Sequence, residues 1–283
     1  MMKARRQVEE DIKLIDLVIE LVDARIPRSS RNPDIDELSR GKARLILLNK
    51  ADLADGAATA RWEKYFAEQG IKAVPIDSRK SGSAKRLLPV IMEACADRIE
   101  RNKRRGIKNR PMRALICGIP NVGKSTFINS FAGKGVARTG NKPGVTKGKQ
   151  WIRLQKDLEL LDTPGILWPR QSDPVVGERL AMIGSINDEI IETTDMAVTI
   201  LRYLVKLAPK ALSERYGLEN VSLPEEEDAA GFYASMLEKV ADYRKCLKKG
   251  GEFDTDKAAV IVIDDFRKGQ FGRITLDEVP ESE

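Results

Sequence analysis

Two short segments of this chain have residue types and spacing suited to binding a nucleotide. Residues 118–125 read G-I-P-N-V-G-K-S, which fits the phosphate-binding pattern G-x-x-x-x-G-K-[ST]. Backbone N–H groups of such a loop surround the β-phosphate, Lys124 reaches the β- and γ-phosphates, and the Ser125 hydroxyl binds Mg²⁺. Gly123 permits the backbone turn that the loop needs. An apolar strand pattern before this segment and a helical pattern after it favour a phosphate loop, here called the P-loop, over an ordinary glycine-rich turn.

The second segment, residues 49–52, reads N-K-A-D and has the form N-K-x-D that binds guanine in GTPases. The Asp52 carboxylate can accept two hydrogen bonds, from the N1–H and the exocyclic amine of guanine. Adenine has no such donor pair, so it would leave the buried carboxylate unpaired. A site built on polar pairing of this kind can reject the wrong base by roughly 10⁴-fold. We therefore expect this guanine motif, with Asn49, Lys50 and Asp52, to select GTP over ATP.

Further residues are expected around the γ-phosphate and the magnesium ion. Asp162 and Gly165 are the ends of a D-x-x-G segment that follows an apolar strand. We expect Asp162 to hold Mg²⁺ through a water molecule and the Gly165 N–H to contact the γ-phosphate. Thr146, in the run P-G-V-T, is the predicted second hydroxyl ligand of Mg²⁺, and Thr139 is the competing candidate.

Four more positions join the predicted GTP-binding set. Ser78 begins the run S-R-K, where a second base-binding loop is expected. Asn121, Val122 and Thr126 lie in the P-loop or directly after it. Asn121 could bind K⁺ beside the phosphates, or it could stabilise the turn, and the sequence leaves both interpretations open.

The group that activates water is the weak point of the predicted site. Many GTPases place a glutamine directly after D-x-x-G, but this chain has Ile166, which can neither donate nor accept a hydrogen bond. The chain contains no histidine. We expect Lys124, Thr146 and Gly165 to stabilise the reacting phosphate, while another side chain, a cation or a partner macromolecule orients the water.

The order of the motifs is unusual, because the guanine motif precedes the P-loop by about seventy residues. Ordinary GTPases bind the phosphates first and the base last, so this order indicates a circular permutation. The termini of a compact α/β domain often lie close together, and a permutation can therefore preserve the site.

Strand patterns predict where these motifs lie. Apolar runs at residues 14–21, 44–48, 112–117 and 158–161 read as strands, and helices are expected between them, including one over residues 84–102. Such alternation implies a mostly parallel sheet with helices on both faces. Ligands of these sheets bind beyond the carboxyl ends of the strands, which is where the motifs fall.

The chain changes character after the D-x-x-G segment. Helical patterns cover residues 175–186, 195–207 and 225–249. We therefore predict an α/β fold, with a circularly permuted P-loop GTPase domain at residues 1–172. A smaller all-α domain is expected at residues 173–283.

Charge is divided unevenly between the two parts. Residues 1–170 carry 35 Lys and Arg against 20 Asp and Glu, whereas residues 171–283 carry 14 against 23. Residues 101–156 contain 15 Lys and Arg and no acid. A solvated linker is the alternative for the densest piece, residues 101–110. The surplus exceeds what one GTP needs, which favours a polyanionic partner such as RNA.

Composition excludes several other classes. No run approaches the roughly 18 apolar residues of a membrane span, so no membrane partner is expected. Cys95, Cys117 and Cys246 lack metal-ligand spacing and read as thiols in a reducing cytosol. The predicted location is cytoplasmic, and no DNA partner is expected.

The motif order N-K-x-D, S-R-K, G-x-P-N-V-G-K-S, P-G-V-T, D-T-P-G is that of the circularly permuted GTPases. The residues around these motifs, including residues 3–8, 20–27 and 160–169, resemble the ribosome biogenesis GTPase A (YlqF/RbgA) family nearly end to end. The resemblance implies a bacterial cytoplasmic GTPase that acts late in assembly of the large (50S) ribosomal subunit. It also implies that the helical domain at residues 173–283 is an RNA-binding module that contacts rRNA, and that the ribosomal particle stimulates hydrolysis. The family's hydrophobic residue after D-x-x-G matches Ile166.

Members of that family usually carry a segment of the form aromatic-Pro-Gly-His-Met before the stretch that matches residues 3–6. Its histidine is implicated in catalysis. This sequence starts at Met1-Met2-Lys3 without that segment, so either the start site is set too late or the segment is missing. For the sequence as written we expect GTP binding to be intact, the intrinsic rate of hydrolysis to be low and the stimulated hydrolysis to be impaired. Two alternatives remain: another RNA-associated or regulatory GTPase, and a GTP-dependent binding protein with little hydrolysis.

Overall fold

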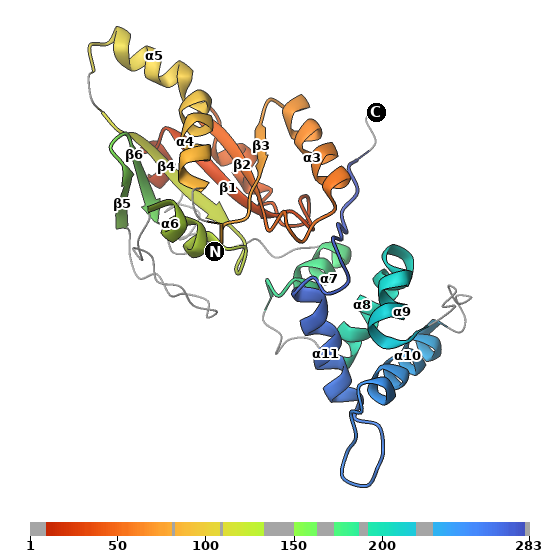
Figure 1. Ribbon diagram of the computed structural model, residues 1–283. Coiled ribbons are helices and arrows are strands. Elements are labelled where there is room, and N and C mark those ends of the chain that lie inside the picture. Colours follow the sequence, from red (N-terminus) through yellow and green to blue (C-terminus); the bar gives the residue numbers. More distant parts are fainter. Residues whose placement is uncertain are drawn as a thin grey trace. The chain divides into compact units, whose positions relative to one another are not determined.

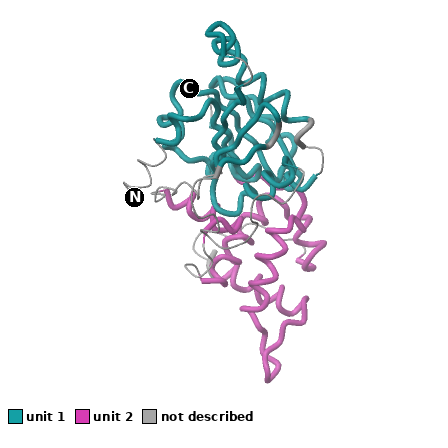
Figure 2. The backbone as a smooth tube through the Cα atoms, turned by 90° about the vertical axis from the view of Figure 1, so that its left-hand side faces the viewer, with its two compact units in different colours: residues 1–172, 277–283 teal, residues 173–276 magenta. Residues whose placement is uncertain are grey.

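The computed structural model describes residues 10–80, 83–107, 110–132, 150–162, 173–186, 192–218 and 229–280. The chain divides into two compact units (Figure 2). The first comprises Met1–Ser172 and Asp277–Glu283, and the second comprises Asp173–Leu276. In the part of the chain that the structure describes, no helix has both the length and the apolarity needed to span a membrane.

The first unit is built on a six-stranded sheet with the strand order β3-β2-β1-β4-β6-β5 (Figure 1). Its strands are β1 (Leu17–Asp23), β2 (Ala43–Asn49), β3 (Lys72–Pro75), β4 (Met112–Gly118), β5 (Gln150–Gln155) and β6 (Leu158–Asp162). Neighbouring strands run parallel except for β5 and β6, which form an antiparallel hairpin. The predicted α/β fold with a mostly parallel sheet is therefore confirmed.

The central strand β1 fixes the position of the motifs on either side of it. All of its residues are buried, as expected of a parallel strand that is covered on both faces. Asp23 pairs with Asn49 of β2, and Leu21 pairs with Gly118 of β4. This register brings the guanine motif and the P-loop to the same edge of the sheet, although they are far apart in the sequence.

Helices cover both faces of the sheet (Figure 1). On one face lie α2 (Asp34–Leu38) and α3 (Gly56–Glu68), and the Trp62 and Phe66 rings of α3 pack against Val22, Ile46 and Leu48. On the other face, α4 (Ser83–Ala94) packs against β2 and against α6 (Lys124–Ala132), which also contacts β4 and β5. The sheet core is thus closed on both sides.

The single helix expected over residues 84–102 is divided into two. α5 (Ala96–Arg104) follows α4 after one turn residue, Cys95, whose φ of −95° and ψ of 5° depart from helical values. Backbone hydrogen bonds nevertheless continue across the break. The Cys95 N–H donates to the Ile91 carbonyl at 3.2 Å, and the Cys95 carbonyl accepts from the Ile99 N–H at 2.9 Å.

The second unit is helical in its described residues, apart from an isolated bridge between Leu247 and Phe253. Its helices are α7 (Pro174–Met182), α8 (Thr193–Leu207), α9 (Pro209–Tyr216), α10 (Ala229–Tyr243) and α11 (Thr255–Arg267). The buried Asp265 of α11 accepts hydrogen bonds from Arg215 and Tyr216 of α9 and from Arg244, just after α10. One carboxylate therefore fastens three helices together.

The sequence prediction is wrong in part for this unit. A single helix was expected over residues 225–249, of which residues 225–228 lie outside the described part. α10 ends at Tyr243, because Lys245 has a φ of 53° and Gly250 and Gly251 also have positive φ, which no helix accommodates. Neither α9 nor α11 was expected.

The chain returns to the first unit after α11. Asp277 accepts hydrogen bonds from the Ser29 N–H at 2.7 Å and the Ser29 hydroxyl at 2.8 Å, and its carbonyl accepts from the Trp62 indole N–H at 3.3 Å. Val279 packs against the cluster that contains Trp62. The second unit therefore ends at Leu276 rather than at residue 283, because these bonds hold the last segment to the sheet domain.

The three cysteines are buried and form no disulfide. Burial raises the pKa of the Cys95 thiol to about 11 and raises that of Cys117 well above its usual value. A thiol that stays protonated is a poor nucleophile and a poor metal ligand.

Candidate functional site

Asn49 joins three segments of the predicted nucleotide site. It ends β2 and is buried. Its side-chain amide donates to the Val122 carbonyl of the P-loop at 2.7 Å. Its side-chain oxygen accepts from the Ser78 N–H at 3.1 Å and from the Ser78 hydroxyl at 2.8 Å. The guanine motif, the P-loop and the S-R-K segment are therefore brought together through one amide.

The P-loop can approach Asn49 this closely only because residue 123 is glycine. Gly123 has a φ of 102°, which side chains rarely adopt, and a Cβ there would lie 2.5 Å from the Asn49 side-chain nitrogen. A similar constraint applies to Gly118, where a Cβ would lie 2.5 Å from the Leu21 carbonyl oxygen. Gly118 and Gly123 are therefore needed for close packing inside the protein, in addition to any role in phosphate binding.

Lys124 begins α6, and its ammonium group lies inside the P-loop. It donates to the Gly118 carbonyl at 2.7 Å and to the Ile119 carbonyl at 2.8 Å. The helix start and the ammonium group together make a positive end that suits an anion. Thr126 lies in the same first turn and is exposed.

Asn121 stands at the tip of the P-loop. It is exposed and has a φ of 57°, a left-handed conformation that asparagine tolerates better than most residues. This conformation gives the residue a role in the turn. The predicted role as a potassium ligand stays a prediction.

Asp52 shows the features of a group that is prepared for a ligand. One carboxylate oxygen, Oδ2, lies 2.5 Å from the Arg79 guanidinium. The other oxygen, Oδ1, is buried and accepts a hydrogen bond from no described residue. Buried acceptors are normally satisfied, so an orphaned one points to a donor supplied by a ligand.

Arg79 was not expected at this place, although it belongs to the S-R-K run. Its side chain is 67% exposed, and it also pairs with Asp77 at 3.1 Å. Hydrogen bonding from Arg79 lowers the pKa of the Asp77 carboxyl and raises that of Arg79 itself. The guanidinium therefore competes for the same Asp52 carboxylate that would accept from guanine.

The buried Asp23 carboxylate, which forms an ion pair with Lys50, was also not predicted from the sequence. Lys50 has a φ of 59°, and its ammonium lies 2.9 Å from Asp23, which also binds Arg25 through two nitrogens at 2.9 Å. Burial alone would raise the pKa of the Asp23 carboxyl, but the charges of Arg25 and Lys50 outweigh it and hold the pKa well below its usual range. The only signal in the sequence is an acid at the carboxyl end of a buried strand.

Part of the predicted metal and γ-phosphate chemistry lies outside the described residues. This applies to Thr146, to its competitor Thr139, and to Gly165 and Ile166. Asp162 is the last residue of β6, but its side chain is not described.

Among the predicted Mg²⁺ ligands, only Ser125 can be compared with the structure. It lies half-buried in the first turn of α6, next to Lys124. A hydroxyl oxygen at this place suits a hard cation such as Mg²⁺, which prefers oxygen ligands.

The sheet, the P-loop and the N-K-x-D segment at the end of β2 define the class of protein. They are those of a P-loop GTPase whose motifs occur in permuted order. Residues 113–222 match the family described as "50S ribosome-binding GTPase".

The chain belongs to the ribosome biogenesis GTPase A family. It is 46% identical over 278 residues to ribosome biogenesis GTPase A of Bacillus licheniformis, a match that covers 98% of this chain and 95% of the relative. A GDP-bound structure of TM YlqF matches with a TM-score of 0.66 and 27% identity, over 98% of this chain and 100% of the other. GNP-bound YlqF from T. maritima matches with a TM-score of 0.64 and 28% identity, over 96% and 97%.

Proposed function

We propose that this protein binds and hydrolyses GTP as an assembly factor for late maturation of the large (50S) ribosomal subunit, in the cytoplasm. The observation that carries the nucleotide part is the Asp52 carboxylate, one of whose oxygens is buried and accepts a hydrogen bond from no described residue. The ribosomal part is supported by near full-length similarity to proteins named ribosome biogenesis GTPase A. The partners are then GTP and GDP, the large subunit and its rRNA.

In this proposal the guanine motif and the P-loop act on opposite ends of the nucleotide. Asp52 accepts from the two donors of guanine, and Asn49 keeps the base loop and the P-loop at a fixed separation. The Lys124 ammonium leaves the two carbonyl oxygens that it contacts and moves to the β- and γ-phosphates. The ammonium group then contacts negatively charged phosphate oxygens in place of neutral carbonyl oxygens, and a hydrogen bond between two charged groups is the stronger interaction.

The reacting phosphate is held by a second group of residues. Ser125, Thr146 and Asp162 would hold Mg²⁺, which neutralises charge on the β- and γ-oxygens when it is bound. The Gly165 N–H would donate to the γ-phosphate, and an N–H aimed at developing charge lowers the barrier.

The water-orienting group is proposed to come from outside this set of residues. Ile166 cannot orient water, so another side chain, a K⁺ ion near Asn121 or the ribosomal particle supplies the missing function. The intrinsic rate is accordingly slow, and the particle stimulates it.

Co-sedimentation with isolated large subunits tests this proposal. The full chain should sediment with the subunits in the presence of a non-hydrolysable GTP analogue and be released with GDP. No association in either state, or association that ignores the nucleotide, would contradict it. A parallel measurement of phosphate release should show a clear increase when subunits are added.

A second candidate, a GTP-dependent binding protein with little hydrolysis, is favoured by one observation: the sequence contains no histidine that could activate water, and Ile166 cannot do so either. Single-turnover hydrolysis with and without large subunits separates the two candidates. A rate that stays at the intrinsic level with subunits, while binding still depends on the nucleotide, supports this second candidate.

A further inference from the structure

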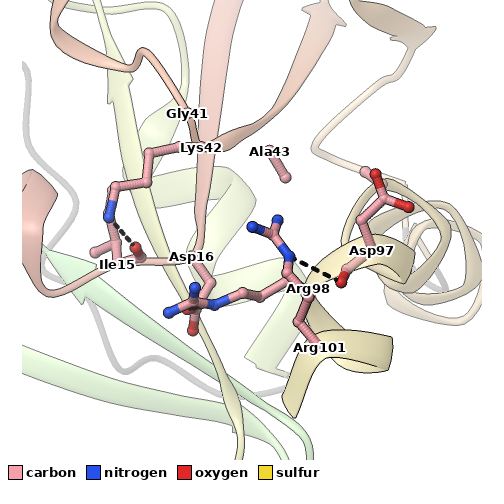
Figure 3. Close-up of a pocket in the computed structure, with 9 residues that line it drawn as sticks. Ile15, Asp16, Gly41, Lys42, Ala43, Asp97, Arg98 and Arg101 are labelled. Carbon is pink, nitrogen blue, oxygen red and sulfur yellow. Dashed lines mark hydrogen bonds and ion pairs between the residues drawn. The ribbon is translucent and has the colours of Figure 1, made fainter. Parts of the chain in front are cut away.

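A basic pocket lies at the edge of the sheet opposite the nucleotide motifs (Figure 3). It has a volume of about 180 Å³ and is formed by the residues that precede β1 and β2 together with α5. Because β1 and β2 are parallel, their amino-terminal ends meet at this edge, and their carboxyl ends carry the guanine motif at the other. A ligand could therefore occupy this pocket while GTP is bound.

Cationic side chains reach the pocket from two elements. Lys42 comes from the turn before β2, and Arg98 and Arg101 come from α5 (Figure 3). Lys42 donates to the Ile15 carbonyl at 2.7 Å, and Arg101 donates to the Asp97 carbonyl at 3.2 Å. Within the described part of the chain, neither Lys42 nor Arg101 lies within ion-pair distance of a carboxylate.

The buried acid in the pocket is already saturated. Asp16 has no exposed side-chain surface, and it binds Arg98 at 3.0 Å and Arg110 at 3.2 Å. It also accepts from the Arg113 N–H at 3.2 Å. The exposed Asp97 is the second acid that lines the pocket. Lys42, Arg98 and Arg101 line it as well, and Arg110 contacts it through Asp16, so four cations face two carboxylates and a positive surplus remains.

The pKa of the Lys42 ammonium group lies below its usual value, chiefly because the group is partly buried. The positive charges of Arg98 and Arg110 lower this pKa further. The opposing attraction of Asp16 does not make up for these two effects. An anion placed in the pocket would remove this repulsion.

The positive charge continues beyond the pocket along the end of α5. The last turn of the helix carries Arg101, Lys103 and Arg104, and Arg105 follows; all four side chains are exposed. Only Arg104 among them pairs with an acid in the described part, Glu100 at 3.2 Å. A pocket followed by a row of exposed cations suits a chain of phosphates better than a single anion.

We propose that this pocket and the basic end of α5 bind the phosphate backbone of RNA. The inference rests on the proposed function, because it names a place on the GTPase domain at which the rRNA of the large subunit is held. Contacts of this kind position a protein on RNA without reading its sequence. The second unit is then not the sole RNA contact of the chain.

The test compares a double variant of the full chain, Lys42→Gln with Arg101→Gln, with the wild type. Glutamine removes the charge and keeps an N–H donor at each position, on a somewhat shorter side chain. A matched control, Arg61→Gln with Lys64→Gln, removes two exposed charges from α3 of the same domain. GDP affinity reports whether each variant keeps its fold, since none of the four positions belongs to the nucleotide site.

Binding to deproteinised large-subunit rRNA and to intact large subunits is measured across a range of salt concentrations. Each lost phosphate contact should reduce the slope of log affinity against log salt by roughly 0.7 to 0.9. The pocket variant should therefore show a slope shallower by roughly 1 to 2 and a severalfold loss of affinity, while the α3 control matches the wild type.

Three results would overturn the inference, and one of them also overturns the proposed function. Wild-type binding to subunits with no difference between the pocket variant and the α3 control would refute the pocket alone. Loss of binding to subunits with unchanged binding to deproteinised rRNA would mean that an acidic protein, and not RNA, occupies the pocket. A wild-type chain that binds neither subunits nor rRNA would contradict both proposals.

Discussion

Replacement of Asn49 by alanine should weaken the fold and nucleotide binding together, because its one amide holds three loops. The variant loses the bond to the Val122 carbonyl at 2.7 Å and two bonds from Ser78 at 3.1 and 2.8 Å. A net contribution of about 1 kcal/mol for each buried hydrogen bond gives a loss of about 3 kcal/mol. Ser78→Ala is the graded control, since it removes one of the three bonds and should cost about 1 kcal/mol.

Two assays divide this loss between stability and binding. Urea unfolding gives the change in free energy of unfolding, and titration with fluorescent GDP gives the change in affinity. If about half of the loss appears in binding, GDP affinity falls roughly tenfold in Asn49→Ala. A variant within about 0.5 kcal/mol of the wild type in both assays would refute the bridging role, as would an equal effect of Ser78→Ala.

Other predictions concern the charged groups next to the guanine motif. Asp23→Asn removes the negative charge that pairs with Lys50 and with the buried Arg25. The variant should be less stable than the wild type by about 3 kcal/mol at pH 7. Because the pKa of Asp23 is depressed in the folded protein, its stabilising effect is complete above about pH 4 and is lost as the pH falls further. The urea concentrations at the unfolding midpoints of the wild type and Asp23→Asn should therefore approach each other as the pH falls below about 4. A difference between the two midpoints that stays constant with pH would contradict this prediction. Arg79→Ala should raise GDP affinity by up to about fivefold, since guanine no longer displaces an exposed ion pair from Asp52, whereas Lys80→Ala should have no effect. A fall in affinity in Arg79→Ala would show that the guanidinium assists the base instead.

Much of the site could be predicted from the sequence because its parts obey local rules. A buried strand that ends at Asn49 and another that ends at Gly118 suffice to place both motifs at the carboxyl edge of a parallel sheet. The contact between Asn49 and Val122 does not follow from that placement, because it also depends on the strand order, in which β1 lies between β2 and β4.

The parts that escaped prediction depend on contacts without a local pattern. Asp277 binds Ser29 across nearly the whole chain, and nothing around either residue indicates the other. Lys50 was read as part of the guanine motif, and its buried partner Asp23 becomes visible only when β1 and β2 are paired. The short helix α9 was missed because it has only eight residues, of which only Leu212 and Tyr216 are buried, too few to show an apolar periodicity.

The most direct measurement is a comparison of GDP and XDP binding by the wild type and by Asp52→Asn. Xanthine has an oxygen in place of the guanine amine, so the amide introduced in the variant would donate to that oxygen and accept from N1–H. The wild type should prefer GDP by roughly 10⁴-fold, and the variant should prefer XDP. An unchanged preference for GDP in Asp52→Asn would contradict the assignment of residues 49–52 as the guanine-binding segment of a permuted nucleotide site.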